Sequence, residues 1–94
     1  MHYVYILHSE KFDKYYVGQT SDVTARLYRH NSGYEGFTKP YRPWKAILIL
    51  EKETPGEAVI LERKLKNLSR QRLKQFIEKY SKKDVEVVSR DDSK

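Results

Sequence analysis

Two runs of β-branched and aromatic residues near the N-terminus place the strongest constraint on the fold of this chain. They cover residues 2–8 and 15–20, and a short polar segment, residues 9–14, lies between them. Runs of this composition are typical of strands, and a short polar connection between two strands favours a hairpin. Because 94 residues suffice for only one modest core, we expect a single domain built around this hairpin.

The predicted hairpin brings two tyrosines into the same part of the molecule. Alternation of side chains along the first strand puts Tyr3, Tyr5 and Leu7 on one face and Val4 and Ile6 on the other. A turn centred on residues 10–11 would place Tyr5 almost opposite Tyr16. The pattern does not settle the register, because a slip of one residue exchanges the two faces.

A helix that ends near Asn31 and then a long loop are predicted to follow the hairpin. Ser21 or Asp22 suits the N-cap of this helix, and Gly33 suits its end. The loop, residues 32–44, contains two glycines and two prolines. It carries an interleaved set of aromatic and basic residues: Tyr34, Phe37, Lys39, Tyr41, Arg42 and Trp44. These side chains would suit stacking on unpaired bases, and they would equally suit the closing of a small core.

The second half of the chain has the pattern of one strand and two helices. The apolar run 46–50 is typical of a strand that is covered on both faces. Thr54 starts a capping box that Glu57 completes, and Ser69 suits the N-cap of a further helix. The sequence also allows a short strand at residues 85–88, followed by a tail.

These elements together predict an α+β fold with the order β-β-α-β-α-α. In this fold a small antiparallel three-stranded sheet is flanked by helices. We expect the domain to cover residues 1–82, and residues 83–94 to form a C-terminal extension.

Several classes of protein are excluded by what the sequence lacks. Cysteine is absent, which rules out disulfide frameworks, cysteine zinc sites and thiol catalysis. No apolar run approaches the roughly 20 residues of a membrane-spanning helix. The N-terminus lacks the basic and apolar pattern of a signal peptide. We therefore expect a cytoplasmic protein that does not contact a membrane.

The charge balance points to a partner rich in phosphate. Lys and Arg number 19 against 13 Asp and Glu, which gives a net charge of +6. Part of this surplus forms a basic series between the two predicted C-terminal helices, namely Lys64, Lys66, Arg70, Arg72 and Lys74. The series fits either nucleic-acid contact or a solvated helix face.

The order and spacing of several motifs resemble the GIY-YIG nuclease superfamily. Tyr3-Val4-Tyr5 precedes Tyr16-Val17-Gly18 by ten residues, as in the paired motifs of that superfamily. A helix with Arg26 and His30 follows, and then a helix with Glu62. The segment Leu68-Ser69-Arg70 is similar to the small stand-alone bacterial members. The resemblance extends from about Tyr3 to Tyr80.

The resemblance implies an active site and a metal ion. It assigns catalytic roles to Tyr5, Tyr16, Arg26 and His30 and a metal-binding role to Glu62. The expected cofactor is Mg²⁺, with Mn²⁺ as a substitute, because a lone carboxylate together with substrate phosphate suits this ion. The planar guanidinium of Arg26 can donate two parallel hydrogen bonds to the oxygens of one phosphate. Either tyrosine would have to lose its proton well below a pKa of ~10 to activate water, and the sequence does not decide which one does.

The implied function is Mg²⁺-dependent endonucleolytic cleavage of DNA. Because there is no room for a separate recognition module, sequence specificity should be low. Structured or single-stranded DNA is the expected substrate, and the same residues could also bind RNA. The chain departs from the family in carrying valine at the centre of both motifs. It also lacks an asparagine about three helical turns after Glu62, where Gln75 is the candidate replacement. This departure supports two alternatives, a non-catalytic nucleic-acid-binding module and a nuclease subunit that needs a protein partner.

Ordinary structural roles also account for each of these residues taken singly. Tyr5 and Tyr16 fit an aromatic cross-strand pair. Arg26 fits a solvated helix position, and an imidazolium at His30 is favoured at the C-terminus of a helix. Glu62 fits an ion pair with the residue one turn later, which contributes only ~0.3–0.5 kcal/mol.

Overall fold

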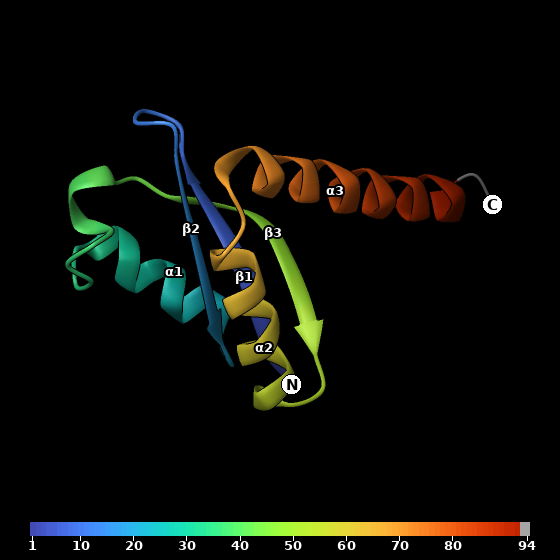
Figure 1. The fold of residues 1–94 in the computed structure, drawn as a ribbon, viewed down its shortest axis with the longest axis horizontal. Helices are drawn as coiled ribbons and strands as arrows, with labels where there is room; N and C mark the ends of the chain where they lie inside the picture. Colours follow the sequence, from blue (N-terminus) through green and yellow to red (C-terminus); the bar gives the residue numbers. More distant parts are fainter. Residues whose placement is uncertain (93–94) are drawn as a thin grey trace.

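Strand β1 (His2–Ser9) lies at the centre of the sheet. It pairs antiparallel with β2 (Lys14–Thr20) on one side and with β3 (Lys45–Lys52) on the other. The computed structural model describes the backbone of residues 1–92 and the side chains of residues 1–81. The remaining elements are α1 (Val23–Ser32), a short 3-10 helix η1 (Lys39–Tyr41), α2 (Pro55–Lys66) and α3 (Arg70–Asp92) (Figure 1). The predicted α+β fold and its order β-β-α-β-α-α are confirmed.

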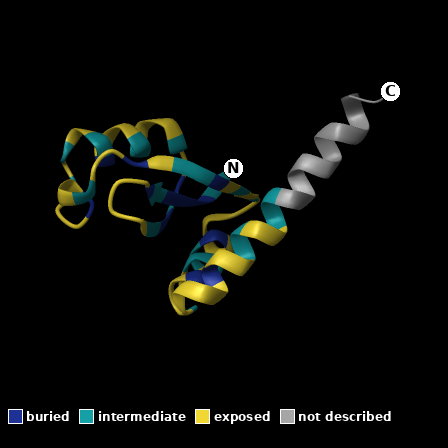
Figure 2. Ribbon diagram, turned by 90° about the horizontal axis from the view of Figure 1, so that it is seen from above, coloured by how far each residue is buried: buried dark blue, intermediate teal, exposed yellow. Residues whose placement is uncertain are grey.

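The two faces of the sheet bury two different cores, with α1 on one side and α2 on the other (Figure 1). The face toward α2 and α3 buries an aliphatic core, which consists of Val4, Ile6, Val17, Leu48, Ala58, Leu65 and Leu73. The face toward α1 buries an aromatic core, in which Tyr5, Leu7 and Trp44 are surrounded by Tyr16, Val23, Leu27, Tyr41 and Ala46. The alternation predicted for the first strand is therefore correct. Figure 2 shows exposed residues along the outer sides of the helices.

The register of the hairpin, which the sequence left open, is shifted by two residues from a direct pairing of Tyr5 with Tyr16. Tyr5 lies opposite Gly18, and Tyr16 lies opposite Leu7. The connection is four residues long between the paired Ser9 and Lys14. It closes through Asp13 in the left-handed region, at φ 51°, a conformation that aspartate tolerates. The two tyrosines still share a face, displaced by one pair along the strand.

The pairing of Tyr5 with Gly18 explains why position 18 is a glycine. A Cβ atom at position 18 would overlap the phenol ring of Tyr5, which lies directly against the Gly18 backbone. The glycine therefore allows the close approach of a side chain from the neighbouring strand. A larger residue would push the Tyr5 ring away from its place in the aromatic core.

The helix starts follow the predicted caps. Asp22 accepts a hydrogen bond from the Ala25 amide at 3.0 Å, and Gly33 ends α1 at φ 83°. Thr54 Oγ1 accepts from the Glu57 amide at 3.2 Å at the start of α2. Ser69 Oγ accepts from the Arg72 amide at 3.2 Å at the start of α3. These local interactions fix where each helix begins.

The prediction of a short strand at residues 85–88 is wrong. Those residues continue α3, which extends to Asp92. No glycine or proline occurs between residues 70 and 94, so nothing in the sequence interrupts the helix. Within residues 1–92, every helix is too short or too polar to cross a membrane.

Candidate active site

A buried hydrogen bond joins the sheet to α1 at the centre of the aromatic core. Tyr5 Oη on β1 lies 2.9 Å from His30 Nε2 in the last turn of α1. Each residue is only 1% exposed. Burial of a polar side chain is costly unless the group is hydrogen-bonded, so each side chain holds the other in place.

The other ring nitrogen of His30 binds a second buried side chain. His30 Nδ1 lies 2.9 Å from Thr38 Oγ1, and Thr38 Oγ1 lies 3.3 Å from the carbonyl oxygen of Glu35. A carbonyl oxygen only accepts, so Thr38 donates its single hydroxyl proton to Glu35 and accepts from His30 Nδ1–H. This assigns the tautomer of the neutral imidazole. Nε2 is then the acceptor for the Tyr5 hydroxyl proton, and the three side chains form a directed chain from Tyr5 to Thr38.

The loop that carries Thr38 is itself held against the sheet. Trp44 Nε1 donates to the carbonyl oxygen of Thr38 at 2.8 Å. Asn31 binds both backbone groups of Trp44, accepting from its amide at 2.6 Å and donating to its carbonyl at 3.0 Å. The position of Thr38 therefore depends on contacts between α1 and the end of the loop.

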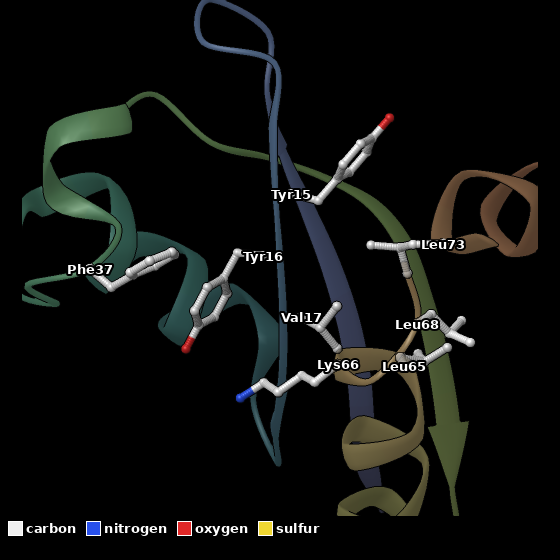
Figure 3. A pocket seen from close by; sticks show the side chains of 8 residues that line it. All are labelled: Tyr15, Tyr16, Val17, Phe37, Leu65, Lys66, Leu68 and Leu73. Atoms are coloured by element: carbon white, nitrogen blue, oxygen red, sulfur yellow. The ribbon is translucent and has the colours of Figure 1, made fainter. Parts of the chain in front are cut away.

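Tyr16 lies beside this chain and nearer to the surface. Its ring centroid is 4.9 Å from that of His30 and 6.4 Å from that of Tyr5. The Lys66 ammonium lies 5.8 Å from the Tyr16 ring centroid, and Figure 3 shows the lysine extending from α2 toward the tyrosine. Tyr16 is half-buried and lines a surface cavity, whereas Tyr5 is enclosed.

Burial decides the protonation of both members of the hydrogen bond. Removal from water raises the pKa of Tyr5 to about 12, the Tyr16 phenol adds to this rise, and the nearby Arg26 guanidinium opposes it. Burial also lowers the pKa of His30, although Glu35 acts in the opposite direction. His30 is therefore neutral near pH 7, contrary to the imidazolium considered from its place at the end of a helix. The Arg26 guanidinium lowers the pKa of both Tyr5 and His30.

Glu62 reaches the same region through an ion pair. Its carboxylate lies 3.3 Å from the Lys66 ammonium, and its side chain is 19% exposed. Among the residues whose side chains are described, no three His, Asp or Glu gather into a metal site. A divalent ion held mainly by substrate phosphate and water needs only one or two carboxylates. Glu62 fits that mode of binding, and it does not fit a site built from protein ligands alone.

The structure brings together some predicted residues and separates others. Tyr5, Tyr16, Arg26 and His30 meet at the aromatic core, and Glu62 approaches them through Lys66. Within the basic series, Arg70 binds Asp13 at 2.6 Å, which ties α3 to the hairpin turn. Gln75 is exposed and lines an open hollow along α3 with Arg70, Gln71, Lys74 and Glu78, away from the tyrosines. Of the loop aromatics, Trp44 belongs to the core, while Phe37 and Tyr34 are exposed.

Two features of the site escaped the sequence analysis. Thr38 and the Glu35 carbonyl were not considered, because a threonine in a polar loop gives no sign that it will be buried against a histidine. Lys66 was predicted as a member of the basic series and as the ion-pair partner of Glu62, a pair that the structure contains, but not as a neighbour of Tyr16. Its spacing of four residues from Glu62 was the available signal for a role beside the metal-binding candidate.

Known proteins are similar to this chain in sequence and in fold. The GIY-YIG catalytic domain family matches residues 1–75. The UPF0213 protein lwe0147 of Listeria welshimeri is 41% identical over 70 residues, which cover 73% of this chain and 77% of that protein. The UPF0213 protein LMOf2365_0181 of Listeria monocytogenes is 34% identical over 93 residues, covering 98% of this chain and 92% of that protein. The solution NMR structure of the UPF0213 protein BH0048 from Bacillus halodurans matches with a TM-score of 0.55 and 32% identity over 82% of each chain.

The matched region contains the whole candidate site. Residues 1–75 include the three strands, α1 and α2, and with them Tyr5, Tyr16, His30 and Glu62. A domain of this type implies nuclease-type activity. The chain belongs to the GIY-YIG catalytic domain family, with small bacterial UPF0213 proteins as its relatives.

Proposed function

We propose that this protein is a metal-dependent endonuclease that hydrolyses phosphodiester bonds in DNA, with selectivity for DNA structure and little for sequence. The observation that carries the proposal is the directed chain from Tyr5 through His30 to Thr38, which lies beside Tyr16 and Arg26. Burial of three polar side chains carries a cost in folding free energy, so their presence is hard to explain by stability alone. In a nuclease-type domain their arrangement fits a preorganised active site.

The two tyrosines differ in a way that assigns their roles. Tyr5 is enclosed, donates a hydrogen bond to His30 and has a pKa raised to about 12, so it serves as a fixed phenol rather than as a base. Tyr16 borders the cavity where water and substrate have access. We assign to Tyr16 the role of general base: its phenol first releases its own proton to solvent, and the phenolate then accepts a proton from the attacking water and returns to the neutral phenol. The Lys66 ammonium beside the Tyr16 ring would stabilise the phenolate that must form before water is activated.

The remaining groups act on the phosphate. Arg26 presents a guanidinium beside Tyr5 and His30, where it would bind a phosphate oxygen and balance the charge that builds up during hydrolysis. Glu62 would hold Mg²⁺, which when bound polarises the phosphoryl oxygen and eases departure of the leaving oxygen. Lys66 now pairs with Glu62 and would have to move its ammonium aside when a metal ion binds.

A second candidate function is nucleic-acid binding without cleavage. It is favoured by the exposed position of Gln75 away from the tyrosines, which leaves no replacement for the missing asparagine among the residues of the site. It is also favoured by the ion pair that occupies the Glu62 carboxylate.

Cleavage assays separate the two candidates. The purified chain is incubated with flapped, nicked, single-stranded and blunt DNA and with RNA, in Mg²⁺, Mn²⁺ or chelator. We expect cleavage with either metal and none in chelator, and loss of cleavage in Glu62→Gln but not in the control Glu78→Gln, which removes an exposed carboxylate on α3. Cleavage by Glu62→Gln at the parental rate would contradict the metal-binding role. Binding without any cleavage would favour the second candidate.

A further inference from the structure

A cavity of about 350 Å³ opens beside Tyr16, and neither His30 nor Thr38 is among its lining residues. It lies across the outer edge of β2, the strand that pairs on one side only. Figure 3 shows the rings of Tyr16 and Phe37 on one side of β2 and the side chains of Leu65, Leu68 and Leu73 on the other. The volume falls within the roughly 300–1,000 Å³ typical of small-molecule sites.

The cavity continues toward the hairpin as a groove with aromatic walls. A second hollow of about 230 Å³ shares Tyr15, Phe37 and Leu73 with the first and adds Lys14 and Arg70. Phe37 is 64% exposed, although its ring centroid lies only 5.9 Å from that of Tyr16. Although Tyr16 and Tyr41 lie beside the Phe37 ring, its exposed surface remains open to a flat apolar ligand. We call these two hollows together the β2 groove.

Cations lie on the aromatic rings at the rim of the β2 groove. The Arg70 guanidinium lies 5.0 Å from the ring centroid of Tyr15, and the Lys66 ammonium lies 5.8 Å from that of Tyr16. Lys14 lies 4.9 Å from the ring centroid of Tyr41. Among residues 1–81, no Asp or Glu lines the two hollows, although Lys66 pairs with Glu62 and Arg70 with Asp13 just outside them. A ligand that combines a flat apolar ring with negative charge matches this distribution, as a nucleotide does.

We propose that the β2 groove binds one unpaired nucleotide of the substrate strand, with its base stacked on Phe37 and its phosphates beside Lys66 and Arg70. This proposal rests on the proposed function and deepens it, because it names the feature of the substrate that the protein selects. A base inside an intact duplex has both faces stacked and its edge paired, so it does not enter a groove that needs a free face. The groove adjoins Tyr16, so the bound nucleotide would lie next to the phosphodiester bond that is cleaved.

The loop offers a matched pair of residues for the test. Phe37 and Tyr34 are both exposed aromatic residues of the loop between α1 and β3, at 64% and 66% exposure. Phe37 lines the groove, whereas Tyr34 stacks under Arg29 outside it. Replacement of each by alanine removes a comparable exposed ring, but only Phe37→Ala removes the proposed stacking surface.

Binding is measured in chelator, so that the result does not depend on catalysis. The probes are a dye-labelled single-stranded oligonucleotide and a blunt duplex of the same sequence, titrated with the full chain and followed by fluorescence anisotropy. We expect Phe37→Ala to weaken single-strand binding by roughly tenfold, as for the loss of one base–aromatic stack. We expect its duplex binding to stay within about twofold of the parent, and Tyr34→Ala to match the parent on both probes. Circular dichroism melting of each variant checks that the fold is retained.

Two results would overturn the proposal, and they differ from failure of the proposed function. If Phe37→Ala weakened binding of both probes equally, or did not weaken binding at all, the groove would bind no unpaired base. This would hold even if the parent cleaves DNA. Absence of binding to either probe by the parent would overturn the groove and the proposed function together, and the groove would then fit a protein partner. Selective loss in Phe37→Ala from a parent that never cleaves would support the groove while contradicting catalysis.

Discussion

The two faces of β1 bury opposite kinds of chemistry within one short strand. On the side of α2 and α3, Val4 and Ile6 enter an aliphatic core in which every member of the buried cluster is apolar. On the side of α1, Tyr5 enters a core that also contains His30 and Thr38, both buried and hydrogen-bonded. Because side chains alternate along a strand, neighbouring residues of β1 enter different cores. The aliphatic face serves only the stability of the fold, whereas the face toward α1 contributes to the core and also carries the polar groups of the site.

The largest change in stability should come from the aliphatic face. Ile6 is fully buried in its core. Ile6→Ala removes apolar contacts and leaves a cavity, and substitutions of this kind cost about 2–5 kcal/mol of the free energy of unfolding. Urea denaturation followed by circular dichroism measures the loss. A cost below about 1 kcal/mol would mean that the aliphatic core is not the main source of stability.

A substitution on the face toward α1 should separate stability from activity. Thr38→Val keeps the shape of the side chain but removes the acceptor of His30 Nδ1–H. An unsatisfied buried donor costs about 1–3 kcal/mol, and loss of the fixed tautomer should slow cleavage well beyond what the loss of folded protein explains.

Thr38→Ser is the control for this effect, because it retains the hydroxyl group. Cleavage rates are compared at a temperature where all variants are folded by circular dichroism. If Thr38→Val cleaved as fast as Thr38→Ser, the orientation of His30 would not matter to catalysis.

The pH dependence of stability should also distinguish the two faces. Burial lowers the pKa of His30 below its ordinary 6.5, so the unfolded chain takes up this proton more readily than the folded one. The contribution of neutral His30 to stability is therefore complete above about pH 6.5 and is lost as the pH falls below it.

His30→Gln removes the titrating group while it keeps a donor and an acceptor. We expect the difference in unfolding free energy between the parent and His30→Gln to shrink between about pH 7 and pH 5, as measured by urea denaturation at several pH values. A difference that stays constant across this range would contradict a histidine held neutral by burial.

The smallest effect on stability is expected at Glu62, which lies at the edge of the site. Glu62→Gln breaks the pair with Lys66, and such pairs one helical turn apart contribute only ~0.3–0.5 kcal/mol. The melting temperature should therefore stay close to that of the parent. A large loss of stability would make Glu62 a structural residue rather than a metal ligand.

What the sequence predicts well in this molecule is local. The hairpin, the caps at Asp22, Thr54 and Ser69, and the end of α1 at Gly33 each depend on residues within a few positions of one another. The register was left open by the sequence, and in the structure Tyr5 pairs with Gly18, across a turn that Asp13 closes in the left-handed conformation.

The parts that escaped prediction depend on distant residues. The burial of Thr38 follows from the packing of Trp44 and Asn31 around it, and no local pattern encodes that packing. The motif tyrosines and His30 were found through family resemblance, whereas their hydrogen bond and the roles of Thr38 and Lys66 required the structure. The continuation of α3 through residues 85–88 shows that a β-branched run is overridden when no residue interrupts the preceding helix.

The difference between the two tyrosines is the point on which the proposed chemistry depends, and single-turnover cleavage of a dye-labelled flapped DNA tests it. The parent, Tyr16→Phe and Tyr5→Phe are compared in Mg²⁺ with enzyme in excess, after melting curves have confirmed that each is folded. Removal of a general base typically slows a reaction by about 10²–10⁴-fold, so Tyr16→Phe should lose at least about a hundredfold in rate, and Tyr5→Phe should lose less. Cleavage by Tyr16→Phe at the parental rate, or a larger loss in Tyr5→Phe than in Tyr16→Phe, would contradict the assignment of Tyr16 as the group that activates water.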